Sequence, residues 1–507
     1  DSCDNDNDND NDNESEKMDP IFEEMLKKSL FLFAFIFSVG FSQTNFVKAE
    51  LLGPGILGSL NYERMVGEKL GVRVGYGGLS LDATDETDFT MTTVNLTAIP
   101  IGVFYNALGQ NNINIRAIAQ GASERNISII IDKDNTKKAL NALHETFFEE
   151  NLKDIHIFIT GVGNVGGFLI EQIRNQKEFI AKNLKINLKV LGISNSRKMI
   201  ISDSEIDLKN WSKNLDKSKT IANSTDFQSK ILELNLRNSL FIDNTASDLI
   251  PITYSEYLNN GIGIITCNKI ANSGTLSNYQ NLKTLSRNNN CSFLYETNVG
   301  AALPVISTLN NLINSGDKII KIEAVLSGTL NYIFNSFNEV DTFHKIVYKA
   351  VDLGYTEPDP KIDLCGVDVS RKILILARES GYKIEIEDIK KNHFLPEDSI
   401  KAESKEDFLL SLEKNKDHFN SILKKAQEND SRLKFVAKLD KGKASVGLES
   451  VSSEHPFYNL AGSDNITVFY TERYKDSPLV VKGAGAGGEF TASGVFADII
   501  KASQGNG

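Results

Sequence analysis

The chain has 507 residues, 41% of them hydrophobic, which is enough for about two to four domains with real cores. Its 55 Lys and Arg against 67 Asp and Glu give a net charge of -12, which argues against nucleic acid or an anionic membrane as the main partner and favours small-molecule chemistry. The cysteines lie far apart, without CxxC spacing, so they indicate neither a disulfide framework nor a zinc site but reduced thiols in a cytosolic enzyme.

Residues 1–24 open with alternating Asp and Asn, a low-complexity tract that is expected to be disordered. Residues 25–43 have a basic start, an apolar run from Leu30 to Phe41 and small residues after it, which is typical of a signal peptide. Residues 44–109 alternate apolar with polar or glycine residues between turn formers, and they resemble a piece of an outer-membrane β-barrel. At roughly 60 residues, this piece offers fewer strands than the smallest closed barrel needs.

The pattern changes in residues 110–150 to a short strand, a second strand at Ile127–Ile131 and an amphipathic helix at Thr136–Glu149. Within it, Ile113–Phe148 resembles the last part of the ACT regulatory region that ends an aspartate kinase, and the best-matching run is AIAQGASERNISIIID. The kinase domain and its glycine-rich motif do not precede it, so we expect no aspartate kinase activity. A partial ACT unit also argues against threonine control.

A buried apolar strand at Ile155–Thr160 leads into a GxGxxG run and then an amphipathic helix, which predicts a dinucleotide-binding turn. In this setting Gly161 permits the tight turn, Gly163 lets the backbone approach a pyrophosphate, and Gly166 lets the helix pack on the strand. Asn164 and Val165, inside the same run, are included in the predicted cofactor site.

Three later segments continue the alternation of strands and helices. They predict strands at Ser239–Asp243, Gly263–Thr266 and Ser292–Tyr295. The fold class is therefore α/β, a Rossmann-like, doubly wound parallel sheet over residues 154–300. Ligands bind at the carboxyl ends of such strands, where Thr245 and Lys269 fall, so both belong to the predicted cofactor site.

The choice between the two nicotinamide cofactors is read from the end of the second strand, LKVLGISNSRKMI. An NAD site usually places Asp or Glu there, whereas the 2′-phosphate of NADP needs positive charge. Arg197 and Lys198 therefore favour NADP(H), with NAD(H) as the second choice. The alternative is that both are solvated loop charges.

The stretch most informative about catalysis is GYTEPDPKIDLCGVDVSRKILILARESG, which carries candidate acid and base residues. Asp368 and Lys372 lie four apart on a helix that runs to Ser380 and stops at Gly381, so they share one face. Glu357 precedes Asp368 by eleven residues in a loop constrained by prolines, which brings acid and base near each other. Taken alone, such a pair is usually a surface ion pair of little energetic weight.

Residues from about 154 to the end resemble homoserine dehydrogenase, in the form that follows an aspartate kinase in bifunctional enzymes. The resemblance rests on five motifs in the family's order. They are TCNKIA, ETNVGAALP, GYTEPDP, the Asp-x-x-x-Lys helix start and GAGAGGEFTASGVFADI. It implies an α+β catalytic and dimerisation domain at residues 301–455 and a C-terminal segment, 456–507, that completes both regions. A glycine loop, Gly483 to Gly488, is expected ahead of a helix at about Ser493–Ala502.

The resemblance also implies roles for single residues. Lys372 would donate and accept the proton at the substrate oxygen, and Lys269 would lie between cofactor and substrate. Glu357 and Asp368 would hold the substrate ammonium group, with Gly354 and Gly487 lining the pocket. A sodium ion would be held by Glu296 and the backbone oxygens of Val299, Ala301 and Leu303. A glycine-lined turn without an ion is the alternative there.

The resulting prediction is a cytoplasmic homodimer or homotetramer that reversibly reduces L-aspartate 4-semialdehyde to L-homoserine with NADPH. Three alternatives stay open. The chain could be a catalytically silent, amino-acid-binding ACT-type regulator, a chimeric outer-membrane protein, or a dehydrogenase for another β-functionalised amino acid.

The simplest interpretation of residues 1–150 is an artificial joining of unrelated pieces. A secreted fusion would be separated from its cytosolic cofactor, and membrane contact is expected only if the front fragment functions.

Overall fold

The computed structural model describes residues 45–50, 59–65, 71–73, 81–82, 89–95, 108–109, 111–120, 126–147 and 152–505. The chain divides into two compact units, the first formed by Asp1–Gly109 with Ile113–Leu140 and the second by Gln110–Asn112 with Asn141–Gly507. The Asp/Asn-rich tract and the signal-like segment, residues 1–43, lie outside the described residues. Among the helices that are described, none combines the length and the apolar character that a membrane span requires.

The first unit contains two small antiparallel sheets. One has the order β1-β2-β3-β4, formed by Asn45–Glu50, Ser59–Met65, Gly71–Arg73 and Leu81–Asp82. The other has the order β5-β7-β6, formed by Phe89–Asn95, Asn126–Asp132 and Ile115–Gln120. It leads through η1 (Lys133–Asn135) into α3 (Thr136–Phe147), so the expected order of strand, strand and helix is confirmed. Strand β5, which the sequence pattern grouped with the hairpin fragment, instead hydrogen-bonds to β7.

The second unit begins with a six-stranded sheet of order β10-β9-β8-β11-β12-β13. Its strands are β8 (Lys153–Thr160), β9 (Ile186–Ser194), β10 (Met199–Ile201), β11 (Ser239–Asp243), β12 (Gly263–Thr266) and β13 (Phe293–Leu294). All neighbours are parallel except β10, which is antiparallel to β9. The predicted doubly wound parallel sheet is thus confirmed, with one added edge strand. The order reverses direction between β8 and β11, and at such a switch point open α/β sheets bind ligands.

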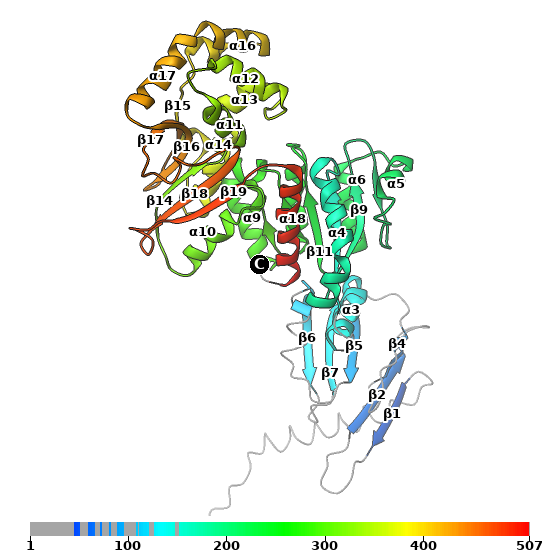
Figure 1. The fold of residues 1–507 in the computed structure, drawn as a ribbon. Helices are drawn as coiled ribbons and strands as arrows, with labels where there is room; N and C mark the ends of the chain where they lie inside the picture. The colour runs from blue at the N-terminus through cyan, green and yellow to red at the C-terminus, as the bar shows by residue number, and fades with distance from the viewer. Residues whose placement is uncertain are drawn as a thin grey trace, which may run out of the picture. The chain divides into compact units, whose positions relative to one another are not determined.

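Helices cover both faces of this sheet because its central strands are apolar on both sides. On one face lie α6 (Ser224–Leu234), α7 (Tyr254–Asn259) and α9 (Leu276–Asn288). On the other, α4 (Asn164–Leu184) packs beside α18 (Gly488–Ser503), the last helix of the chain (Figure 1). The shorter elements are α5 (Trp211–Lys217), η2 (Ile250–Thr253) and α8 (Ile270–Ser273).

A second six-stranded sheet has the order β15-β17-β16-β14-β18-β19. Its strands are β14 (Ile319–Val325), β15 (Lys390–Asn392), β16 (Arg432–Asp440), β17 (Lys443–Val451), β18 (Asp464–Thr471) and β19 (Leu479–Ala484). The accompanying helices are η3 (Glu296–Asn298), α10 (Val305–Asn314), α11 (Gly328–Ser336), α12 (Phe343–Asp352), α13 (Pro360–Leu364), α14 (Val367–Glu379), η4 (Ile386–Asp388), α15 (Glu397–Lys401), α16 (Lys405–Lys414) and α17 (Lys416–Glu428). Together with the first sheet this gives the expected combination of a Rossmann-like and an α+β domain.

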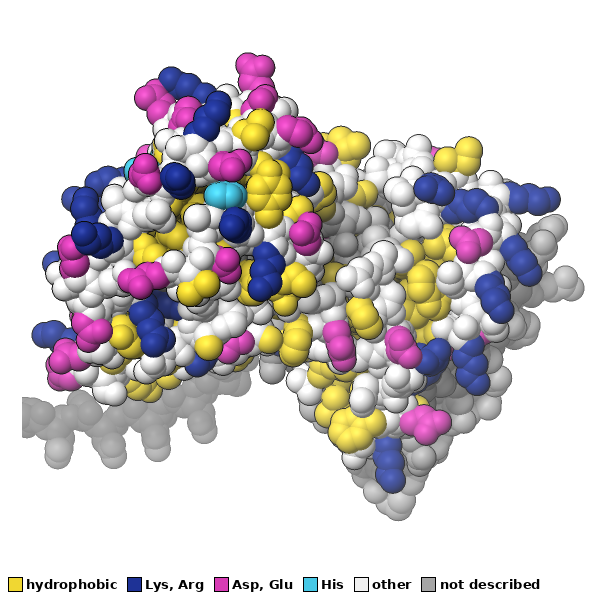
Figure 2. Space-filling view, turned by 45° about the horizontal axis from the view of Figure 1, so that its top comes forward, with side chains coloured by type: hydrophobic (Ala, Val, Ile, Leu, Met, Phe, Trp, Pro, Cys, Tyr) yellow, Lys and Arg dark blue, Asp and Glu magenta, His cyan; other side chains and the backbone are white. Residues whose placement is uncertain are grey.

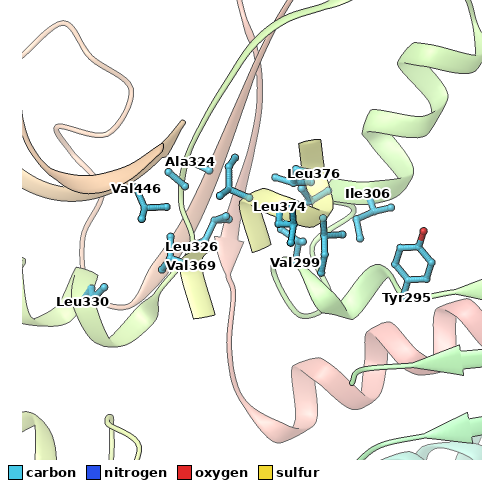
Figure 3. Close-up of a cluster of buried hydrophobic side chains, with 14 of the residues drawn as sticks. Tyr295, Val299, Ile306, Ala324, Leu326, Leu330, Val369, Leu374, Leu376 and Val446 are labelled. Carbon is cyan, nitrogen blue, oxygen red and sulfur yellow. The ribbon is translucent and has the colours of Figure 1, made fainter. Parts of the chain in front are cut away.

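Helix α14 lies in the middle of the largest hydrophobic core. Figure 3 shows part of that core, with Val369, Leu374 and Leu376 of α14 among side chains from β14, the start of α11 and the Tyr295–Ile306 stretch. A single cluster of buried side chains therefore reaches from the first six-stranded sheet to the second. Burial on this scale holds α14 rigidly, and α14 carries two of the predicted site residues.

Candidate active site

The predicted dinucleotide turn is built as the glycine spacing requires. Gly161 has a φ of +87°, and a Cβ there would lie 2.8 Å from the backbone carbon of Asn244. A Cβ on Gly166 would lie 2.1 Å from the Gly161 carbonyl oxygen, so the helix can approach the strand only because this residue has no side chain. Around Gly163, the residue before α4, a Cβ would meet nothing within 4 Å.

This turn fits the pyrophosphate of a dinucleotide. The space beside Gly163 lies at the N-terminus of α4, whose first turn, including Asn164 and Val165, contains no acidic residue. The N-terminal end of a helix presents unpaired N–H groups and a positive dipole to an anion. Next to it, the Asn244 amide has neither its nitrogen nor its oxygen paired within the described residues. The turn therefore offers donors, positive potential and room for a phosphate group.

The two basic residues after β9 are placed differently from each other. The Asn195 side chain accepts hydrogen bonds from the backbone N–H groups of Arg197 (2.8 Å) and Lys198 (2.7 Å), which shapes the loop. The Lys198 ammonium group donates to the carbonyl of Asp216, whereas the Arg197 residue is exposed. Arg197 is therefore the better placed of the two to meet a phosphate at this loop.

A buried carboxylate that the sequence analysis did not select organises the ends of β11 and β12. Asp243 accepts from the backbone N–H of Thr245 (2.8 Å) and from the side-chain amide of Asn268 (3.2 Å). Asn268 in turn accepts from the N–H of Ile270, the first residue of α8, directly after Lys269. Burial raises the pKa of Asp243, opposed by these hydrogen bonds. Asp243 thus positions Thr245, whose methyl group lies beside Gly161, and the segment that carries Lys269.

The structure brings Lys269, Asp368 and Lys372 together. One carboxylate oxygen of Asp368 lies 2.8 Å from Lys372 Nζ, and the other lies 3.3 Å from Lys269 Nζ. Helix α14 can begin just before Asp368 because Gly366 adopts a φ of +67° and its missing side chain leaves room for the Phe435 ring. Lys372 is only 9% exposed whereas Asp368 is 47% exposed, so the ion pair joins a buried ammonium group to a half-exposed carboxylate.

The charges of this cluster shift one another's protonation. Burial lowers the pKa of Lys372, the neighbouring Asp368 opposes that shift, and Lys269 adds to it. Burial alone would raise the pKa of Asp368, yet the two ammonium groups hold it well below its ordinary value. The cluster therefore keeps Asp368 ionised and leaves Lys372 a better proton donor than an exposed lysine.

Two further carboxylates approach the cluster from the residues before α14, Glu357 from the loop before α13 and Asp363 from α13 itself. Glu357 is exposed, and its backbone N–H donates to Asp363 at 2.8 Å. Burial, with the negative charges of Glu357 and Asp368, raises the pKa of Asp363 to about 6. The sequence analysis missed Asp363, although a signal was present in the same stretch, since it follows Glu357 by six residues and precedes Asp368 by five.

The two glycines predicted to line the pocket take left-handed backbone conformations. Gly354 is exposed with a φ of +70°, and Gly487, with a φ of +116°, precedes the first residue of α18. The expected glycine loop is shorter than predicted, because Gly483 lies in β19 and α18 begins at Gly488 rather than near Ser493. Packing of α18 along α4 compensates for the weak helix propensity of its first residues.

The segment predicted to bind sodium has a different use for its acidic side chain. The Glu296 carboxylate accepts from the backbone N–H groups of Ile306 (2.6 Å) and Ser307 (2.8 Å), so it caps the N-terminus of α10. Ala301 has a φ of +53°, which is uncommon for a residue with a side chain. No group of three or more His, Cys, Asp or Glu that could hold a metal occurs in the described part of the chain. Ligation by Glu296, Val299, Ala301 and Leu303 stays a prediction.

Arg378 is a third residue that the sequence analysis missed, after Asp243 and Asp363. It lies on α14, and its side chain donates to the Asn272 carbonyl of α8 (2.8 Å) and to the Glu385 carboxylate (2.7 Å). It therefore ties the helix of Lys372 to the short helix that follows Lys269.

On the face shown in Figure 2, acidic and basic side chains are interspersed, without the one-sided positive field that nucleic acid would require.

Three family models match the chain. The model described as "Homoserine dehydrogenase" matches residues 304–500, "Homoserine dehydrogenase, NAD binding domain" matches residues 161–296, and "ACT domain" matches residues 102–147.

Among curated relatives, the homoserine dehydrogenase of Schizosaccharomyces pombe is 39% identical over 358 residues, which cover 69% of this chain and 95% of that protein. The chloroplastic bifunctional aspartokinase/homoserine dehydrogenase 1 of Zea mays is 42% identical over 403 residues, which cover 79% of this chain and 44% of that protein. The chain therefore spans less than half the length of this bifunctional relative.

Two solved structures have the same fold. A Candida auris protein of unknown function is 34% identical with a TM-score of 0.64, and the match covers 69% of this chain and 98% of that one. A hyperthermophilic archaeal homoserine dehydrogenase in complex with NADPH is 27% identical with a TM-score of 0.53, and the match covers 69% and 97%.

Proposed function

We propose, since this chain belongs to the homoserine dehydrogenase family, that it catalyses the reversible reduction of L-aspartate 4-semialdehyde to L-homoserine with NADPH. The observation that carries the proposal is the cluster in which Asp368 contacts both Lys269 and Lys372 on the core helix α14. The matched family models describe dehydrogenase and ACT parts, so the proposal includes no aspartate kinase activity.

The binding of the cofactor depends on the residues of the glycine turn. Gly161, Gly163 and Gly166 shape the turn at the start of α4, where the pyrophosphate would accept hydrogen bonds from backbone N–H groups. Thr245, beside Gly161, and Lys269 would extend the same surface toward the nicotinamide. When bound, the reduced nicotinamide supplies a hydride to the aldehyde carbon of the substrate.

Lys372 would supply the proton. As the aldehyde carbon is reduced, its oxygen gains negative charge, which a fixed ammonium group stabilises before it transfers a proton. The lowered pKa of Lys372 favours that transfer, while Asp368 maintains its charge in the resting enzyme. Lys269 would add a second positive charge beside the reacting group. In the reverse direction, the neutral amine of Lys372 would accept the proton from the alcohol of homoserine.

The substrate would be held by its own charges. Its ammonium group would pair with the carboxylates of Glu357, Asp363 and Asp368, which approach one another closely enough to influence the pKa of Asp363. Gly354 and Gly487 would leave room for the amino acid. An amino acid therefore suits this site better than a simple aldehyde, because the aldehyde has no cation for the carboxylates to bind.

We also propose that NADPH is preferred over NADH, since Arg197 is the basic side chain free to meet a 2′-phosphate at the end of β9. Arg197→Ser should raise the KM for NADPH roughly tenfold or more, which corresponds to the free energy of a charge-assisted hydrogen bond. The KM for NADH should stay unchanged. Lys198→Ala is the control, because its ammonium group already donates to the Asp216 carbonyl. Equal changes for both cofactors would contradict the proposal.

Three further expectations are part of the same proposal. Glu296 and the backbone oxygens of Val299, Ala301 and Leu303 would hold a sodium ion. Replacing sodium salts with choline salts during assays tests this, since activity should then fall. The enzyme would act in the cytoplasm as a homodimer or homotetramer, and sedimentation of the purified chain would show which.

The central test is a spectrophotometric assay of nicotinamide reduction with L-homoserine and each cofactor in turn. We expect NADP-dependent oxidation of homoserine and none of its methyl ether, which has no alcohol to oxidise. Absence of any homoserine-dependent rate in the folded protein would refute the proposal. Faster oxidation of another β-functionalised amino acid would reassign the substrate.

A further inference from the structure

Lys372 is held from two directions, and only one of them is its own helix. Its Nζ donates to the backbone carbonyl of Leu326 at 2.7 Å in addition to pairing with Asp368. Leu326 follows the last residue of β14 and precedes Ser327, the residue that caps α11 through its side chain. Its carbonyl therefore lies where the chain leaves the sheet and is available to side chains.

A second side chain donates to the same carbonyl. The Asn465 amide nitrogen, on β18, lies 3.2 Å from Leu326 O and 3.4 Å from the carbonyl oxygen of Gly485. The two donors to Leu326 O, Lys372 Nζ and Asn465 Nδ2, are therefore no more than about 6 Å apart. A carbonyl oxygen has two lone pairs, so a donor at one of them restricts where the other donor can lie.

The residues around Asn465 make room for its amide, although the buried amide oxygen also lowers the stability of the folded state. A Cβ on Gly485 would lie only 2.0 Å from the side-chain carbonyl carbon of Asn465, so this glycine makes room for the amide. Asn465 is 1% exposed, and its Oδ1 has no hydrogen-bond partner among the residues that the structure describes. A buried polar atom without a partner destabilises the folded state, and a leucine of similar shape would avoid that penalty. Because this penalty offsets the two hydrogen bonds that the amide nitrogen donates, stability alone gives little reason for an asparagine at this position.

We infer that Asn465 is a positioning residue for the proton donor: its amide occupies one side of the Leu326 carbonyl and so directs the Lys372 ammonium group along the other. The inference rests on the proposed function of Lys372. It assigns a part in proton transfer to β18, through Asn465, and to Gly485, which makes room for the Asn465 amide. The amide acts through Leu326 and leaves the charges around Lys372, which are Asp368, Lys269 and Asp363, unaltered.

The first test is Asn465→Leu in the full chain. We expect kcat to fall roughly three- to tenfold, the weight of one hydrogen bond, with KM for the cofactor unchanged and Tm no lower than in the parent protein. Thr467→Val is the matched control, since Thr467 is buried on the same strand and the same face. An unchanged kcat, or a loss of kcat that accompanies a loss of Tm, would overturn the inference.

The second test is Asn465→Asp, which places a carboxylate near the Lys372 ammonium group and should raise its pKa. The pH dependence of Lys372 labelling by a small amine-reactive reagent, followed by mass spectrometry, measures that pKa without any turnover. We expect the labelling midpoint to move to higher pH, and an unmoved midpoint would overturn the inference. If the parent protein oxidises no homoserine, the proposed function fails, while the labelling result still decides the role of Asn465.

Discussion

The Gly161 turn and the cluster around Lys372 are built in opposite ways. The turn is assembled from residues 160–166, which are consecutive in the chain, and single residues such as Ser194, Asn244 and Thr245 approach it from elsewhere. The cluster takes Lys269 from the nucleotide-binding sheet, the Leu326 carbonyl from the end of β14, and Asp368 and Lys372 from α14. The comparison teaches that the proposed cofactor site depends on local sterics, whereas the proposed proton-transfer site depends on how distant segments pack.

The largest effect is expected at the cluster. Lys372→Ala removes the proposed proton donor and should lower kcat roughly a hundredfold to ten-thousandfold, the usual contribution of a placed acid or base. Binding of NADPH, measured by quenching of protein fluorescence, should stay near that of the parent, because the turn is a separate structure. Lys401→Ala, in an exposed ion pair, is the control. Near-normal turnover in the Lys372 variant would refute its assigned role.

The Gly161 turn should be disrupted by a single added methyl group. Gly166→Ala would place a Cβ 2.1 Å from the Gly161 carbonyl oxygen and force α4 away from the strand. Overpacking of this kind costs about 1–3 kcal/mol, so the Kd for NADPH should rise roughly five- to hundredfold. Gly167→Ala is a control one residue away, because its Cβ meets nothing within 4 Å. Equal affinities in the two variants would mean that the turn is not the cofactor site.

A smaller effect is expected when the charge of Asp368 is removed and the shape of its side chain is kept. Asp368→Asn keeps the shape of the side chain but removes the negative charge that raises the pKa of Lys372. That pKa should therefore fall further, and the loss of reductive activity on the basic side of the pH profile should begin at lower pH. The profile of kcat for aspartate semialdehyde reduction checks this. A shift to higher pH would contradict the assigned direction.

The smallest effect is expected from the front of the chain. A chain that starts at Asn151 should retain nearly all of the parent's kcat, because the turn and the cluster both lie in the second unit. The fission yeast relative supports this expectation, since the match covers 95% of its length. Circular dichroism should accompany the assay. A shortened chain that is folded yet inactive would show that residues 1–150 contribute to catalysis.

Sequence patterns predicted the local features well. The strand, turn and helix around Gly161 follow from apolar runs and glycine spacing, and β11 and β12 were predicted at their observed bounds. The predicted face of α14 with Asp368 and Lys372 is confirmed by their 2.8 Å contact. The start of α18 was misplaced, because glycine-rich residues form a helix there only through packing on α4.

By itself, the amino-acid sequence determined what depends on neighbours in the chain: the periodicity of strands and helices, the glycine turn, and the two charges one helical turn apart. Only the tertiary structure decided which distant groups surround Lys372, among them Lys269, the Leu326 carbonyl and Asn465. Backbone carbonyls carry no residue-type signal, and burial sets how strongly charges interact. For that reason Lys372 could be proposed as the proton donor from the sequence, whereas the backbone and amide groups that contact or approach it required the fold.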